Sequence, residues 1–378
     1  MAVLTEEQTL LRDAARNWAQ EKSPVSAFRK MRDSGAPLGY DPAAFAEMAA
    51  MGWAGVIIPE AYGGSDFGYL SLGLILEETG RTLTASPLLA SSLAAASALI
   101  LGGSEAQKQA WLPKLAEGEA VATLAVDEGP RHDPAGVKLK AEKGGAGYVL
   151  TGEKSFVLEG MAASVLVVSA RTGGKPGDTD GITLFLVPAD AAGMVRKPLK
   201  LADSRGAADI SFQGVSVGAD AVLGEEGKGW ALLDKTLDRA RAGMAAEMLG
   251  AAHQAFDMTL DYLKTRVQFD QPIGGFQALQ HRAAHMFGQL ELSRSCVEAA
   301  LTAIDQDAPD AAQLASLAKA KMGETLYLVS NETIQMHGGI GMTDAHDAGF
   351  YLKRARSAEA AYGGRAFHRD RYATLNGF

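Results

Sequence analysis

Cysteine is nearly absent from this chain of 378 residues, because Cys296 is the only one. A single thiol excludes an internal disulfide and a thiolate metal cluster, and it suits a reducing cytoplasm. The first residues, MAVLTEEQTLLRDAARNWAQ, lack the basic and apolar regions of a signal peptide. The longest apolar stretch, LAAASALIL, is too short to span a membrane. We therefore expect a soluble, cytoplasmic protein without membrane insertion.

Basic runs are also missing. The chain has 36 Lys and Arg against 45 Asp and Glu, which gives a formal net charge of -9. Nucleic-acid binders carry clustered basic residues, so we expect no nucleic-acid partner. The length allows two or three packed subdomains.

Several chemical motifs can be set aside. His281 and His285 in HRAAH have the spacing of two metal ligands on one helix face, but the first is not followed by a glutamate and no third ligand is near. We therefore predict no metal site. The glycines of HGGIGMT, residues 337–343, follow a helical pattern rather than a strand, so they are not a Rossmann fingerprint. No Walker A sequence or nucleophile elbow occurs either.

Periodicity divides the chain into three parts. Residues 1–120 show helical spacing interrupted by Gly and Pro, and residues 121–223 show short β-type runs between glycine-rich turns. Residues 224–378 return to helical spacing and suggest a four-helix bundle. Its predicted helices are 228–265, 276–303, 310–337 and 346–372. The predicted fold is α+β and multidomain: an N-terminal helical domain, a middle β-barrel-like domain and a C-terminal helical bundle.

One carboxylate stands in a run of small and apolar residues. Glu247 lies in AGMAAEMLGAA, residues 242–252, and no cation lies within one helical turn of it. It could be a solvated glutamate on a helix surface, since Glu is rarely fully buried. Alternatively, it lies in an apolar cleft, where desolvation increases its proton affinity and lets it act as a base near neutral pH. The residues around it leave both interpretations open.

Five segments, in order along the chain, resemble landmarks of the acyl-CoA dehydrogenase family. The resemblance covers essentially the whole sequence and implies FAD between the β domain and the bundle, with an acyl-CoA thioester beside the flavin. It also implies a tetramer, either a homotetramer or an α2β2 heterotetramer, and an electron-transfer flavoprotein as partner. The segments are MAAMGWAGVIIPEAYGG (48–64), QKQAWLPKLAEGE (107–119), YVLTGEKSFV (148–157), YLKTRVQFDQPIGGFQALQH (262–281) and QMHGGIGM (335–342).

The resemblance assigns cofactor-binding residues in the last part of the chain. Arg266, at the start of RVQF, is expected to reach the FAD phosphates from a neighbouring subunit, with Phe269 against the adenine end. Gln335, Gly338 and Gly339 match the segment where backbone comes close to the cofactor, which the missing glycine side chains permit. The alternatives are an exposed arginine and a helix C-cap.

In the β domain, LAVDEGPRHDP (124–134) is similar to the family's flavin-contacting loop, but departs from its usual Thr-Glu-Pro-Gly pattern. Val126 replaces a hydroxyl residue that often bonds the flavin. Phe156 and Leu158 stand where Trp and Thr are common. Phe156 can still pack against the isoalloxazine ring. The missing hydroxyls put flavin affinity or redox tuning in question.

Neither of the positions that carry the catalytic base in the family has a carboxylate in this chain. Tyr362 stands at the position of the common catalytic Glu, and a phenol is a poor base at neutral pH. Ala240, just before Arg241, occupies the second family position. Glu247 lies two helical turns beyond Ala240, on nearly the same face. The local sequence resembles a branch that degrades steroid side chains and other bulky acyl-CoA thioesters, in which a Glu here is proposed as base. We therefore predict Glu247 and Arg241 as catalytic residues for α,β-desaturation.

Two other functions stay open. The altered flavin loop is compatible with a non-catalytic or half-site partner subunit of a mixed tetramer. A third possibility is another elimination reaction on an acyl-CoA. Small residues at Gly243, Ala246 and Gly250 hint at a roomy pocket, but the acyl group and the electron acceptor are not readable from the sequence.

Overall fold

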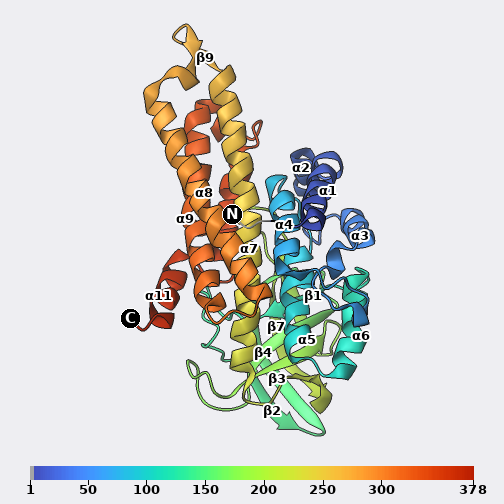
Figure 1. Ribbon diagram of the computed structural model, residues 1–378. Coiled ribbons are helices and arrows are strands. Elements are labelled where there is room, and N and C mark those ends of the chain that lie inside the picture. The colour runs from blue at the N-terminus through green and yellow to red at the C-terminus, as the bar shows by residue number, and fades with distance from the viewer. Residues whose placement is uncertain (1–3) are drawn as a thin grey trace. The chain divides into compact units, whose positions relative to one another are not determined.

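The structure is a computed structural model that describes residues 4–378 (Figure 1). It contains two compact units that do not follow chain order. The bundle unit comprises the described residues up to Lys30, together with Gly73–Thr84 and Arg241–Phe378. The β unit comprises Met31–Leu72 and Ala85–Ala240. The order of elements, helices then strands then helices, confirms the predicted fold class.

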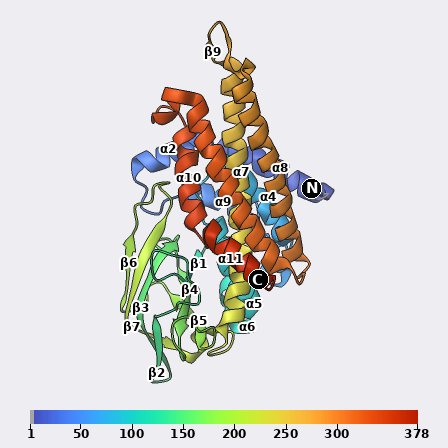
Figure 2. The same ribbon diagram turned by 90° about the vertical axis from the view of Figure 1, so that its left-hand side faces the viewer.

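The β unit contains a sheet in the strand order β6-β7-β3-β2-β4-β5-β8, with β1 parallel to β4. Figure 2 shows β6, β7 and β3 on one side of this sheet. Every residue of β4, the run VLVVSAR, is buried, as expected for a strand covered on both faces. The strands are β1 Ala122–Ala125, β2 Lys140–Gly144, β3 Gly147–Leu158, β4 Val165–Arg171, β5 Ile182–Pro188, β6 Met194–Pro198, β7 Ala207–Gly218 and β8 Val222–Leu223.

Short helices belong to the β unit as well. The helix α6 begins with a capping box, in which the Ser104 hydroxyl accepts from Gln107 N and the Gln107 side chain accepts from Ser104 N. The same Gln107 amide donates to the Asp220 and Val222 carbonyls, which ties α6 to the end of the sheet. The helices of this unit are α3 Pro42–Ala50, η1 Trp53–Gly55, η2 Glu60–Tyr62, the π-helical η3 Leu88–Ala95, α5 Ala96–Gly102, α6 Glu105–Ala116 and η4 Ala219–Ala221.

In the bundle unit, long helices lie side by side, and the β9–β10 hairpin joins α7 to α8 at one end (Figures 1 and 2). Three helices have residues in both units: α2 Val25–Ser34, α4 Gly68–Arg81 and α7 Gly229–Thr265. The other elements of this unit are α1 Glu6–Lys22, β9 Val267–Gln268, β10 Gln271–Pro272, η5 Ile273–Gly275, α8 Gln277–Asp305, α9 Ala311–His337, η6 Gly338–Met342, α10 Ala348–Ala360 and α11 Arg365–Leu375.

The last predicted helix, 346–372, is wrong as a single helix. The structure divides it into α10 and α11 at a turn of four residues. Tyr362 has φ +57° and Gly363 has φ +102°, so the chain leaves the helical region there. The turn between α10 and α11 carries Tyr362, the residue predicted to stand at the position of the family's common catalytic Glu.

Two glycines let α4 and α7 approach closely. A Cβ on Gly80 of α4 would lie 2.2 Å from the Glu247 carbonyl oxygen of α7. A Cβ on Gly250 of α7 would lie 1.7 Å from the Glu77 carbonyl oxygen of α4. Backbone therefore fills the space beside Gly250, and the expectation that this glycine opens room for a substrate is wrong. Its physical role is helix packing.

Candidate functional site

Glu247 is buried in the bundle unit, with 6% of its surface exposed, so the solvated-surface interpretation is wrong. Arg354 of α10 donates from Nε (3.0 Å) and Nη2 (2.8 Å) to Glu247 Oε1. The guanidinium is buried too, and its Nη2 lies 3.7 Å from Met244 Sδ. The expectation of a carboxylate in purely apolar surroundings is therefore corrected, because its cation comes from a distant part of the chain.

This ion pair has a direct chemical consequence. A buried carboxylate without a cation would take up a proton, whereas an adjacent guanidinium favours the charged form. The ionised carboxylate is the form that can accept a proton from a substrate. Burial and the Arg354 contact fix the orientation of the Glu247 carboxylate and place a cation beside it.

Arg241 is fully buried and lies near the turn between α10 and α11. Its Nε lies 3.5 Å from the Tyr362 carbonyl oxygen, and its guanidinium carbon is 5.5 Å from the centre of the Phe367 ring. His368 Nε2 lies 3.0 Å from the same carbonyl oxygen and donates to it in the tautomer protonated there. These contacts fix the backbone of Tyr362, the residue at the family's usual base position.

A buried lysine that sequence analysis missed binds one carbonyl of this turn and one at the end of α10. Lys319 of α9 donates from Nζ to the Glu359 and Gly363 carbonyl oxygens, each at 2.9 Å. Burial lowers the pKa of Lys319 to about 7, the Glu359 carboxylate opposes that shift, and the charges of Arg241 and Arg354 reinforce it. Lys319, Arg241 and Arg354 therefore form a group of three positive charges that act on one another in the bundle unit.

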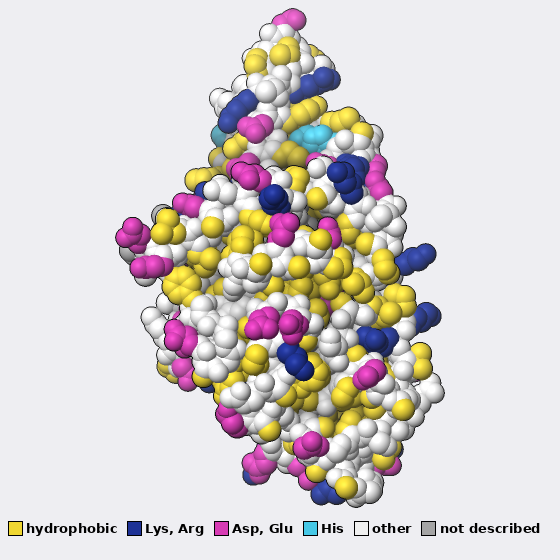
Figure 3. Space-filling view, turned by 90° about the vertical axis from the view of Figure 1, so that its right-hand side faces the viewer, with side chains coloured by type: hydrophobic (Ala, Val, Ile, Leu, Met, Phe, Trp, Pro, Cys, Tyr) yellow, Lys and Arg dark blue, Asp and Glu magenta, His cyan; other side chains and the backbone are white. Residues whose placement is uncertain are grey.

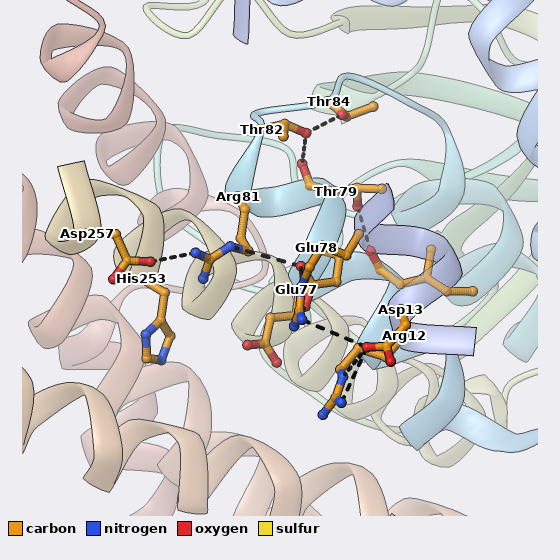
Figure 4. A network of polar contacts seen from close by, with 12 residues as sticks. Arg12, Asp13, Glu77, Glu78, Thr79, Arg81, Thr82, Thr84, His253 and Asp257 are labelled. Carbon is orange, nitrogen blue, oxygen red and sulfur yellow. Dashed lines mark hydrogen bonds and ion pairs between the residues drawn. The ribbon is translucent and has the colours of Figure 1, made fainter. Parts of the chain in front are cut away.

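A network of polar contacts ties α4 to α7 and α8 near Glu247; Figure 4 shows part of it. Arg294 of α8 donates to the buried Glu77 carboxylate at 2.9 Å and to His253 Nε2 at 2.9 Å. Arg81 donates to Asp257 at 2.5 Å. A further ion pair, between Arg16 of α1 and the buried Glu78, lies at 2.8 Å. Together with the glycine contacts, these bonds fix the position of α7, and with it Glu247, relative to α4.

His253 predicts a pH dependence of stability. Burial, with the charges of Arg294 and Arg81, lowers its pKa from 6.5 to about 3. Between these values the unfolded imidazole binds a proton that the folded one does not, so the free energy of unfolding should fall as pH drops from 6.5 towards 3. For one proton the slope is at most about 1.4 kcal/mol per pH unit.

We expect His253→Gln, which keeps an acceptor for Arg294, to make this slope shallower. Urea unfolding at pH values from 7 to 4.5 measures it. His285→Gln, at an exposed position on α8, is the control for loss of an imidazole. Equal slopes in His253→Gln and the unaltered protein would contradict the assignment.

In the β unit, Val126, one of the predicted flavin-contacting residues, is held by a buried lysine. Lys154 Nζ donates to the Val126 carbonyl (2.9 Å), to Glu128 (2.7 Å) and to Ser169 Oγ (3.0 Å), which uses all three of its protons. Val126 is buried, so its side chain supplies packing and no hydrogen bond. Sequence analysis missed Lys154, whose partners come from two other segments.

Phe156 and Leu158 follow Lys154 on β3. Phe156 has φ +56°, uncommon for an aromatic residue, and its backbone N–H donates to the Asp209 carboxylate at 3.2 Å. The Leu158 carbonyl accepts from Thr123 Oγ1 at 2.6 Å. Both residues are half-buried. Their backbone conformation is fixed by side chains of other strands.

Two carboxylates organise the loop 126–134, which sequence analysis singled out only for its missing hydroxyl. The Asp127 carboxylate lies 2.9 Å from His132 Nδ1 and accepts from Asp133 N at 3.2 Å. The Glu128 carboxylate accepts from Lys138 N at 2.6 Å, besides its bond with Lys154. The loop is therefore rigidly held without the usual sequence pattern.

The remaining predicted cofactor residues lie in the bundle unit. Arg266 is exposed at the end of α7, and Phe269, 84% exposed, lies in the turn of the β9–β10 hairpin with φ +54°. On the face in Figure 3, acidic and basic side chains are interspersed. Hydrophobic side chains show near the hairpin at the top, beside Lys and Arg side chains. An exposed aromatic ring and an exposed arginine three positions apart suit an aromatic, phosphate-bearing ligand.

Gln335 lies in the last turn of α9, and Gly338 and Gly339 follow it. A Cβ built on either glycine would meet no atom of residues 4–378 within 4 Å. Gly338 is the C-cap residue of α9 with φ +62°, so the helix C-cap alternative holds for this glycine, whereas packing within the described chain does not explain Gly339. Both leave open space at backbone level. That space and the Arg266 guanidinium fit a large anionic cofactor such as FAD.

His281 and His285 are both exposed on α8, and no group of three or more His, Cys, Asp or Glu side chains within residues 4–378 is arranged to hold a metal ion. Within the same residues, no helix is both long and apolar enough to span a bilayer.

Comparison with known proteins agrees with this architecture. Residues 5–119 match the acyl-CoA dehydrogenase N-terminal domain, 122–215 the middle domain and 227–374 the C-terminal domain. Cyclohex-1-ene-1-carbonyl-CoA dehydrogenase of Geobacter metallireducens is 33% identical over 349 residues, which are 90% of each chain.

Two solved structures share the fold over nearly the whole chain. Butyryl-CoA dehydrogenase from Megasphaera elsdenii has a TM-score of 0.92 and 28% identity, covering 100% of this chain and 99% of the other. The steroid ACAD Tcur3481-Tcur3483, as its G363A variant, has a TM-score of 0.88 and 32% identity, covering 98% of both chains.

The three domains and the shared fold define a flavoprotein oxidoreductase that acts on acyl-CoA. The chain belongs to the acyl-CoA dehydrogenase family.

Proposed function

We propose that this chain is an FAD-dependent acyl-CoA dehydrogenase that desaturates an acyl-CoA thioester between its α and β carbons, with Glu247 as the base. The observation that carries this proposal is the buried Glu247 carboxylate held by the Arg354 guanidinium. A thioester α proton needs a base that is deprotonated, desolvated and fixed in place. In this role, the Glu247 carboxylate takes the α proton as the substrate loses a hydride from its β carbon.

FAD, when bound, would supply the hydride acceptor at its N5 atom. Arg266 would hold the cofactor's phosphates, with Phe269 at the adenine end, and Gln335, Gly338 and Gly339 would border it. In the β unit, the fixed backbone of Val126, Phe156 and Leu158 would serve the flavin ring. The bonds of Lys154 to Val126, of Asp209 to Phe156 and of Thr123 to Leu158 support this role, because they fix that backbone.

Arg241 is proposed to act beside Glu247. Its buried guanidinium and its place near the Tyr362 carbonyl support a role in shaping the site. We further propose an electron-transfer flavoprotein as oxidant, a cytoplasmic location and a homotetramer or α2β2 heterotetramer. The acyl group is proposed to be bulky, in keeping with the similarity to the steroid ACAD.

The experiment is a turnover assay of the purified chain with FAD, an artificial electron acceptor and a panel of short, branched and steroid acyl-CoA thioesters. We expect one class of thioester to lose two hydrogens by mass. A product that has lost a hydrogen together with a leaving group, instead of two hydrogens, would favour another elimination. Turnover only after addition of a related chain would favour the half-site partner subunit, a candidate that the absent hydroxyls at Val126 and Leu158 support.

A further inference from the structure

Arg354 is carried by a helix that is anchored towards both ends. Near the start of α10, the Tyr351 hydroxyl donates to the Arg81 carbonyl oxygen at 2.6 Å. At its end, Lys319 donates to the Glu359 and Gly363 carbonyl oxygens. The position of the Arg354 guanidinium is therefore set by the packed bundle.

Two nitrogens of Arg354 bind the same carboxylate oxygen. Both Nε and Nη2 reach Glu247 Oε1, and both side chains are buried. An exposed ion pair contributes little to stability, but a buried pair is strongly coupled, since removing one partner leaves an uncompensated charge. The charged groups nearby are Arg241 on α7 and Lys319 on α9, with Glu359 close to Lys319.

We propose that Arg354 is a positioning residue for the reaction, whose guanidinium holds the Glu247 carboxylate turned towards α10 until the acyl-CoA thioester arrives. This inference rests on the proposed function, in which Glu247 is the base. Arg354 itself is not assigned a contact with substrate. It acts through the direction of the carboxylate and the positive charge beside it.

The kinetic test is the pH dependence of flavin reduction by the active thioester, followed by stopped flow. Arg354→Met removes the positive charge beside the buried carboxylate, so we expect the acidic limb of its profile to move up by at least one pH unit. Arg354→Lys keeps the positive charge, so its acidic limb should lie close to that of the unaltered protein. Arg356→Met removes a neighbouring arginine whose guanidinium carbon lies over Tyr327, 4.3 Å from the ring centre, and should leave the limb in place.

An unmoved acidic limb in Arg354→Met would overturn the proposal. Should that variant not fold, Arg354→Gln, also neutral, is measured with the same expectation. A second readout needs no turnover: thermal melting of Arg354→Met, Glu247→Gln and the double variant. We expect Arg354→Met to lower the melting temperature, and most of that loss to disappear in the Glu247→Gln background.

Additive melting losses would show that the two side chains do not interact, and would overturn the role of Arg354 while leaving the proposed function intact. Failure of the proposed function is distinguishable. In that case the unaltered protein with FAD would show no reduction by any thioester, whatever the melting cycle gives.

Discussion

Glu247→Gln is expected to lower the rate of thioester-dependent flavin reduction about 10²- to 10⁴-fold, the range that a positioned general base contributes. Glutamine keeps the size of the side chain and an oxygen that can accept from Arg354, but it cannot take up the α proton. FAD content should stay at the level of the unaltered protein, because Glu247 lies outside the residues proposed to hold the cofactor.

The matched control is Asp261→Asn on the same helix, at a side chain that is 80% exposed. It removes one carboxylate from α7 without touching the bundle interior, and we expect unchanged flavin reduction. Near-normal reduction in Glu247→Gln would remove this residue as the base and direct attention to Tyr362 or to a partner chain.

Gly250→Ala is expected to lower the free energy of unfolding by about 3 kcal/mol, at the upper end of typical overpacking effects. The added methyl carbon would meet the Glu77 carbonyl oxygen at 1.7 Å and the Arg81 backbone nitrogen at 3.1 Å. Both are backbone atoms, which cannot turn aside as a side chain can. Relief requires α4 and α7 to separate, which would also strain the neighbouring bonds of Arg81 and Arg294.

Gly288→Ala on α8 is the matched control, because a Cβ there meets no atom of the described chain within 4 Å. It should stabilise the protein by about 0.5–1 kcal/mol, since alanine loses less backbone entropy in a helix. Urea unfolding of the three proteins measures both effects. Equal stability of Gly250→Ala and Gly288→Ala would contradict the close helix crossing.

Hydrophobic periodicity predicted the long helices well, because each keeps an apolar face over many turns. The predicted 228–265 and 310–337 differ from α7 and α9 by one residue at their starts. The break between α10 and α11 was missed. It depends on Tyr362 taking a left-handed conformation, and carbonyls held by Lys319 and Arg241 stabilise that turn through tertiary contacts.

The candidate site could be predicted only in part, for a related reason. The composition around Glu247 indicated an unusual carboxylate, but its cation lies 107 positions further along the chain. No local spacing rule identifies such a pair. The prediction for Gly250 was wrong for a different reason. A glycine can line a pocket or allow two helices to cross closely, and only the position of α4 distinguishes the two.

The central claim, that this chain by itself oxidises an acyl-CoA with a bound flavin, is tested most directly by one absorption spectrum. The chain is purified alone and recorded from 300 to 600 nm, before and after anaerobic addition of each thioester in the panel. We predict a yellow protein whose flavin band bleaches with one class of thioester. A colourless protein that gains flavin only with a second chain would contradict this claim and would indicate that the chain is a half-site partner subunit.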